Sequence, residues 1–123
     1  VQCYIAQKNF KKLQEKQKRF DEIREYYNSE FGRENKSRHL YRLNAKDNQT
    51  MISQMKTSFI QCGKHYSALH LNPVYNTKKL NLPKAEFENK TTFSIPFHEK
   101  LTDEDVEYIV KEVKRHVIAP YSR

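Results

Sequence analysis

The sequence predicts an α+β fold, in which a small, mostly antiparallel sheet is covered by helices and preceded by a long N-terminal helix. Three observations predict it. Apolar residues recur at helical spacing at both ends of the chain, shorter stretches suited to strands lie between them, and a length of 123 residues is typical of one domain. Because these elements show no internal repeat, residues 1–123 are expected to form a single layered domain.

The first element is predicted as one helix over residues 2–31, where large apolar side chains recur at spacings of three, four or seven. Gly32 can then adopt the left-handed conformation that ends a helix. Such a helix would be about 45 Å long, whereas a domain of this size is roughly 35 Å across. We therefore expect it to overshoot its own domain and to pack against something else. Its apolar stripe is Phe10, Leu13, Phe20, Ile23, Tyr27 and Phe31.

The elements that follow are short. Residues 38–45 alternate in the way typical of a strand, and Asp47 or Asn48 can cap the helix after it. Residues 59–62 are predicted as another short strand, which ends at Gly63. The face of the first strand is expected to hold His39, Tyr41, Leu43 and Ala45, and the helix stripe Met51, Ile52, Met55 and Phe59.

Residues 63–91 are predicted as one long connection. Loops of this length are usually functional or disordered, and the histidines and tyrosines within this one favour a functional loop. Residues 92–97 suit a short strand, which Pro96 places at an edge or at the strand's end. Thr102 is a natural N-cap for the last helix, which is acidic in its first turn and basic in its last. Its apolar stripe is Val106, Ile109, Val110, Val113 and Val117.

Charge and composition limit the classes of function. The net charge of +8, from 23 basic and 15 acidic side chains, favours phosphate-bearing partners such as nucleic acid, a membrane surface or a nucleotide-linked substrate. No apolar run approaches the roughly 20 residues of a membrane span, and the start does not resemble a signal peptide. Cys3 and Cys62 are too few for a disulfide framework and are predicted to be buried. We therefore expect a cytoplasmic protein.

The sequence shows no catalytic set of its own. The five histidines lack the spacing of a helical metal site, and two glycines are too few for a glycine-rich phosphate loop. No serine or cysteine nucleophile stands out with a histidine and an acid. The sequence therefore predicts neither catalytic residues nor a metal site, and it indicates a domain that is not a self-sufficient enzyme.

Three stretches in a fixed order carry a resemblance. They are a glutamine-led helix with a basic and Tyr-Asn end at 2–28, a His-Leu-Tyr strand at 38–41 followed by a His-Tyr loop at 60–75, and a Ser-Ile-Pro segment with a final helix at 94–106. Together they resemble the C-terminal part of the DegT/DnrJ/StrS-type sugar aminotransferases. These are pyridoxal-phosphate enzymes that aminate nucleotide-linked keto-sugars. Phe59 stands where that family usually has glycine.

The resemblance implies the fold of the small aminotransferase domain, with residues 1–31 as its connector helix and 63–91 as a functional loop. In the family the loop equivalent to residues 63–75 approaches the active site and helps to hold the sugar nucleotide. The resemblance therefore names His65, Tyr66 and His70 as substrate-binding candidates.

The resemblance also implies a cofactor and partners. The parent enzyme would use pyridoxal phosphate, a nucleotide-sugar substrate and an amino donor, and it would form a homodimer without binding membrane or nucleic acid. The cofactor lysine would lie in a large domain preceding Val1, so that this chain would bind no cofactor covalently. The substrate would belong to cell-surface or secondary-metabolite sugar biosynthesis.

The residues alone leave another class open, a small basic nucleic-acid-binding or scaffolding α+β module without enzymatic activity. Net charge and interleaved aromatic residues are compatible with nucleic-acid binding. Against it, the chain has no aromatic RNA-binding motif and no Gly-x-x-Gly loop.

Overall fold

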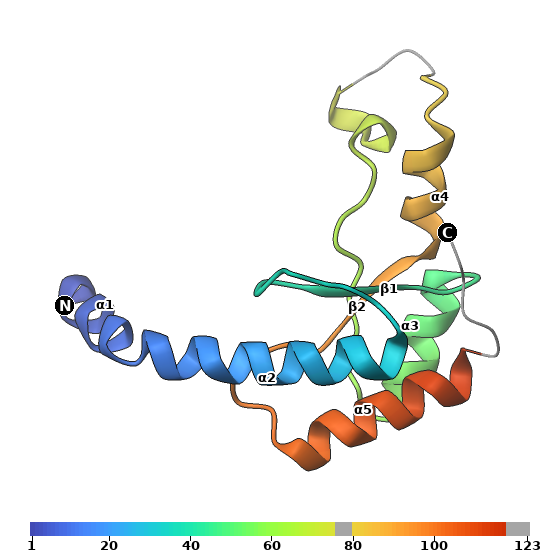
Figure 1. Ribbon diagram of the computed structural model, residues 1–123. Coiled ribbons are helices and arrows are strands. Elements are labelled where there is room, and N and C mark those ends of the chain that lie inside the picture. The colour runs from blue at the N-terminus through green and yellow to red at the C-terminus, as the bar shows by residue number, and fades with distance from the viewer. Residues whose placement is uncertain (76–79, 118–123) are drawn as a thin grey trace.

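Two short strands pair antiparallel at the centre of a mostly helical fold, so the predicted α+β class with a small antiparallel sheet is confirmed (Figure 1). The structure is a computed structural model that describes residues 1–75 and 80–117. Its elements in chain order are α1 (Gln2–Lys11), α2 (Leu13–Phe31), β1 (Tyr41–Asn44), α3 (Asn48–Thr57), the 3-10 turns η1 (Leu69–Leu71) and η2 (Pro73–Tyr75), α4 (Pro83–Thr91), β2 (Thr92–Ile95) and α5 (Asp103–His116).

The core lies on one face of the sheet. Tyr41 pairs with Ile95 and Leu43 with Phe93, and all four side chains are buried. The Tyr27 ring packs edge-on against Tyr41, with 5.0 Å between ring centroids, because α2 crosses this face. The helices complete the core with Ile23 and Tyr27 from α2, Met51 and Met55 from α3, and Val106, Ile109, Val110 and Val113 from α5.

The predicted helix 2–31 is two helices, which differs from the expectation of one. The chain bends at Lys12, whose φ of −95° and ψ of 3° leave the helical region. No residue of α1 is buried, and Phe10 is 74% exposed. Figure 1 shows α1 projecting beyond the rest of the domain. The expectation that this element overshoots its own domain is therefore confirmed for α1.

Polar contacts at two places hold α2 against α5. The Arg19 guanidinium donates to the Leu101 carbonyl at 2.6 Å and pairs with the Asp103 carboxylate at 2.9 Å. Near the other end of both helices, Lys114 pairs with Glu30. The two helices are thus fixed to each other at both ends of their contact.

The start of α5 agrees with the prediction. The Thr102 hydroxyl accepts from the Asp105 N–H at 3.1 Å, and the Asp105 carboxylate accepts from the Thr102 N–H at 3.0 Å. This reciprocal capping box satisfies two of the N–H groups that a helix start leaves unpaired. The hydrogen bonds to Thr102 also lower the pKa of the Asp105 carboxyl.

Phe59 does not belong to the α3 stripe, because the helix ends before it. The Phe59 N–H donates to the Lys56 carbonyl, and the Ile60 N–H donates to the Met55 carbonyl. This pair of hydrogen bonds is typical of a helix that ends in a left-handed residue. Phe59 occupies the left-handed position at φ 59° and is 98% exposed. Residues 59–62, predicted as a strand, therefore begin with this turn, and only Gly63 bridges to β2.

Phe59→Gly is expected to stabilise the protein by about 1 kcal/mol, because glycine adopts positive φ without the steric cost that a Cβ brings. The exposed phenyl ring contributes little burial that could offset this gain. The midpoint of urea denaturation, at unchanged m-value, measures the effect. Phe59→Ala is the control, since it removes the ring and keeps the Cβ. Equal stability of the two variants would show that the backbone strain is negligible.

The predicted connection 63–91 is not one loop. Its last nine residues form α4, which begins at Pro83 and runs directly into β2, and residues 76–79 lie outside the described residues. Cys62 is buried as predicted, but Cys3 is exposed on α1, where nothing covers it within the described residues. His39 also lies exposed, outside the buried face formed by the alternate residues of β1. No helix in the described part of the chain is long and apolar enough to cross a membrane.

Candidate functional site

The site loop leaves the sheet at Gly63. Its N–H bonds to the Ser94 carbonyl at 3.0 Å, and the Ser94 N–H bonds to the Gly63 carbonyl at 2.7 Å. A Cβ at residue 63 would come within 2.6 Å of His65 Cε1. The His65 imidazole therefore lies against the backbone of residue 63, and a side chain at this position would displace the ring.

His65 and Tyr66, both predicted as substrate-binding residues, lie side by side. Their rings meet edge to face with 5.3 Å between centroids. The imidazole is half-buried, whereas Tyr66 is 72% exposed. The pair thus presents a half-buried imidazole and an exposed phenol.

His70, the third predicted residue, lies apart from this pair. Its side chain is only 7% exposed, and its Nε2 lies 3.5 Å from Glu86 Oε1 of α4. The Ala68 N–H bonds to Asn89 Oδ1 at 2.9 Å in the same region. Figure 1 shows this loop and α4 extending side by side from the sheet. The structure thus assigns His70 a contact that fastens the loop to α4.

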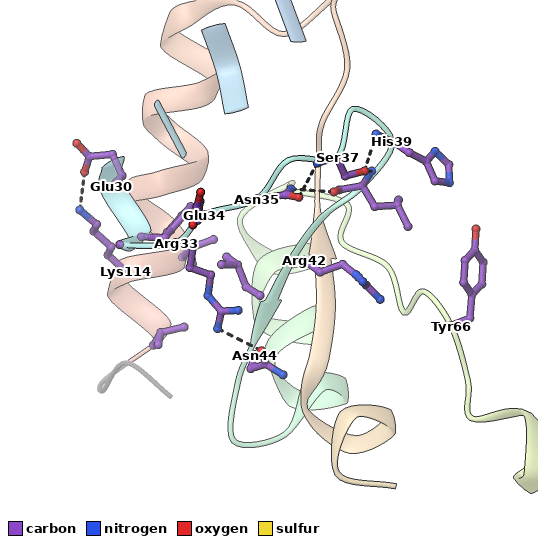
Figure 2. Close-up of a pocket in the computed structure, with 16 residues that line it drawn as sticks. Glu30, Arg33, Glu34, Asn35, Ser37, His39, Arg42, Asn44, Tyr66 and Lys114 are labelled. Atoms are coloured by element: carbon purple, nitrogen blue, oxygen red, sulfur yellow. Dashed lines mark hydrogen bonds and ion pairs between the residues drawn. The ribbon is translucent and has the colours of Figure 1, made fainter. Parts of the chain in front are cut away.

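A cavity of about 950 Å³ opens beside Tyr66. It is bounded by the C-terminal ends of α2 and α5, the segment 32–40 and β1 (Figure 2). Among its described lining residues, Tyr66 is the one that sequence analysis named as a candidate. Its cationic side chains are Arg33, Arg42 and Lys114, of which Lys114 pairs with Glu30.

Buried Asn44 forms the floor beneath Arg33. Its Oδ1 accepts from Arg33 at 3.2 Å, a contact drawn in Figure 2. Its Nδ2 lies at 3.1 Å from Thr91 Oγ1 and from Thr92 Oγ1, and at 3.2 Å from Glu88 Oε2. One amide therefore joins β1 to the junction of α4 and β2 and holds the Arg33 guanidinium at the cavity.

The sequence reasoning missed Arg33, Arg42 and Asn44. The one available signal was the polar Asn44 within a short strand that is otherwise rich in large side chains. Alternation along the strand also places Arg42 and Asn44 on the face opposite Tyr41 and Leu43. Polar side chains on one face of a strand are compatible with a binding surface.

Enzymes that use pyridoxal phosphate carry it on a lysine side chain. That lysine needs a desolvated pocket and an acid partner for the pyridine nitrogen. No lysine among residues 1–75 and 80–117 is buried. Burial raises the pKa of the Cys62 thiol to about 11, so it is protonated at neutral pH and is no nucleophile. In the same residues no three His, Cys, Asp or Glu side chains gather to hold a metal ion.

The fold is that of a known class of protein domain. Residues 1–114 match the DegT/DnrJ/EryC1/StrS aminotransferase family, and the chain belongs to this family. It is 33% identical to the uncharacterized protein MJ1066 of Methanocaldococcus jannaschii, in a match that covers 95% of this chain and 36% of that protein.

Solved structures show the same fold. The aminotransferase TlmJ of Streptoalloteichus hindustanus aligns with a TM-score of 0.77 and 24% identity, over 88% of this chain and 33% of TlmJ. The apo form of the putative sugar aminotransferase Spr1654 of Streptococcus pneumoniae aligns with a TM-score of 0.79 and 24% identity, over 89% of this chain and 32% of Spr1654. The chain spans about a third of the length of these relatives.

Proposed function

We propose that this chain is the C-terminal domain of a pyridoxal-phosphate-dependent enzyme that aminates a nucleotide-linked keto-sugar in cell-surface or secondary-metabolite sugar biosynthesis. The observation that carries the proposal is the family match over residues 1–114. The fold likeness to Spr1654, which has been solved in forms with pyridoxal phosphate and pyridoxamine phosphate, supports the choice of cofactor.

The proposal divides the work between two parts of the enzyme. Pyridoxal phosphate supplies the chemistry that moves the amino group from an amino donor to the sugar. As the family resemblance implies, we assign the cofactor lysine to the part of the enzyme outside this chain, and the chain alone is expected to bind no cofactor covalently. We place the enzyme in the cytoplasm as a homodimer.

In this proposal the chain binds and orients the sugar nucleotide. The half-buried His65 imidazole and the exposed Tyr66 phenol face the substrate, while His70 positions their loop through its contact with Glu86. The His65 imidazole packs against the backbone of Gly63 and edge-on to the Tyr66 ring, and in this proposal these contacts restrict its orientation. A ligand therefore meets a group that is partly ordered, which lowers the entropic cost of binding.

His65→Ala in the full-length enzyme is expected to lower kcat/KM for the nucleotide keto-sugar by about 10- to 100-fold, because it removes a fixed hydrogen-bonding group. Retention of pyridoxal phosphate and the reaction with the amino donor should be unchanged. Steady-state kinetics and the cofactor content after gel filtration measure these quantities.

Two further variants test whether the placement of the His65 imidazole causes this effect. Gly63→Ala should lower the same kcat/KM, since a Cβ there displaces the imidazole. His98→Ala is the matched control, because that histidine is exposed and lies in the turn before α5. If His65→Ala had the kinetics of the parent enzyme, the substrate-binding role of this loop would be refuted.

A further inference from the structure

The segment 63–68, which carries the two adjacent site rings, is fastened at both ends to one stretch of chain. At its start, the backbone groups of Gly63 and Ser94 form two hydrogen bonds, of 2.7 and 3.0 Å. At its end, the Ala68 N–H donates to Asn89 Oδ1 at 2.9 Å. Ser94 and Asn89 lie close in sequence, where α4 runs directly into β2. The segment is therefore closed across a single α4–β2 unit.

Helix α4 is itself anchored to the body of the domain by a buried side chain. Asn48, in the first turn of α3, is 2% exposed. Its Nδ2 donates to the Asn89 carbonyl and to the Thr92 carbonyl, each at 2.9 Å. The last carbonyls of a helix lack partners within that helix, so this amide fixes the C-terminal end of α4. Asn89 thus accepts from α3 through its backbone and from the site loop through its side chain.

Helix α4 adds little to the core. Of its described residues, Thr91 alone is buried. The helix contacts the site loop at two places, because Glu86 Oε1 lies 3.5 Å from His70 Nε2, about one turn before the Asn89 bond. Figure 1 shows the loop and α4 extending side by side from the sheet. A helix with almost no buried face and two contacts to this loop supports the loop rather than filling the core.

The bond from Asn89 to Ala68 lies next to the site rings. Ala68 follows Tyr66 by two residues, so their Cα atoms are at most about 7 Å apart. The Ala68 carbonyl in turn accepts from the Leu71 N–H at 3.0 Å, which begins the turn η1. In this contact Asn89 acts as an acceptor, and its Nδ2 donates to no residue in the described part of the chain. One acceptor oxygen therefore fixes the point at which the loop leaves the site rings.

We propose that Asn89 is a positioning residue for the loop that carries His65 and Tyr66. Through the Ala68 N–H it fixes the path of residues 63–68, and with it the placement of the two rings. That this loop binds the sugar nucleotide rests on the proposed function, whereas the support from α3 through α4 to the loop rests on the hydrogen bonds. An ordered loop loses less conformational entropy when a ligand binds, so the bond favours substrate binding over the chemical step.

Asn89→Leu removes the acceptor and has two expected results. In the 123-residue chain, solvent exchange of the Ala68 N–H, measured by NMR, should rise by about tenfold or more, because this amide loses its hydrogen bond. In the full-length enzyme, KM for the nucleotide keto-sugar should rise by about tenfold, with kcat changed by less than about twofold. The urea midpoint and the cofactor content show that the variant is folded.

Asn89→Asp keeps an acceptor oxygen at the same place, so it should restore both the slow exchange of the Ala68 N–H and the parent KM. Asn81→Leu is the matched control, because it makes the same substitution at an exposed residue two positions before α4. It should change neither quantity.

The outcomes separate the positioning role from the proposed function. Equal exchange of the Ala68 N–H in Asn89→Leu and Asn81→Leu, or a defect that Asn89→Asp does not restore, would overturn the positioning role. Faster exchange that Asn89→Asp restores, together with an unchanged KM, would preserve the positioning role and refute substrate binding by this loop.

Discussion

Asn44→Leu is expected to lower the free energy of unfolding by about 2–3 kcal/mol, because it strips a buried network of its central amide. Three oxygen acceptors, on Glu88, Thr91 and Thr92, lose an N–H donor, and Arg33 loses its acceptor. Leucine is similar in size to asparagine, so the loss reports on hydrogen bonding more than on packing. Urea denaturation followed by circular dichroism measures it.

Asn9→Leu provides the control for this experiment. Asn9 lies exposed on α1, and the same exchange of side chains there should change stability by less than about 0.5 kcal/mol. Arg33 also depends on Asn44, so Asn44→Leu should release the guanidinium from the cavity. A variant with the stability of the parent would show that the amide is not the junction between β1 and α4.

The chain is expected to self-associate as a symmetric pair through α1 and the first turn of α2, in keeping with the proposed homodimer. Phe10, Leu13, Tyr4 and Ile5 are all exposed there. Each large apolar side chain gains about 1.5–3 kcal/mol on full burial, and twofold contacts are the commonest closed arrangement. The double variant Phe10→Glu/Leu13→Glu should raise the dissociation constant by about 100-fold or more in sedimentation equilibrium.

The choice of position matters in this experiment. Phe20 belongs to the same stripe, but its ring packs on Phe97 at 5.1 Å between centroids, so its substitution would disturb the domain itself. Phe59→Glu is the suitable control, since it places the same charge at an exposed apolar residue far along the chain. A strictly monomeric chain whose α1 amides are protected from hydrogen exchange would contradict the association.

Short sequence signals, such as a capping residue or a regular apolar spacing, correctly predicted the elements that depend on neighbouring residues. The start of α5 follows from Thr102 and its neighbours, and its apolar stripe from a regular spacing. Helix α4 was missed because it has few apolar residues and so shows no helical periodicity, although Pro83 at its first turn was an available cue. The turn at Phe59 was missed because the residue that usually signals it is glycine.

The site was predictable only in part for a different reason. His65 and Tyr66 were named through a family resemblance, and the structure does place their rings together. The partners of Arg33 and Asn44 lie far away in sequence, beyond what spacing within one element can reveal. The approach of His70 to Glu86 was also not predictable, because nothing in a single sequence shows that α4 stands beside the loop.

The ties between α2 and α5 have a mechanical consequence. Arg19 and Glu30 are eleven residues apart, and so are their partners Asp103 and Lys114. Because the two helices run parallel and rise equally per residue, the two ion pairs lie about 16 Å apart along both of them. A slip of α5 along α2 by one helical turn would break both ion pairs at once, so together they favour a single register between the two helices.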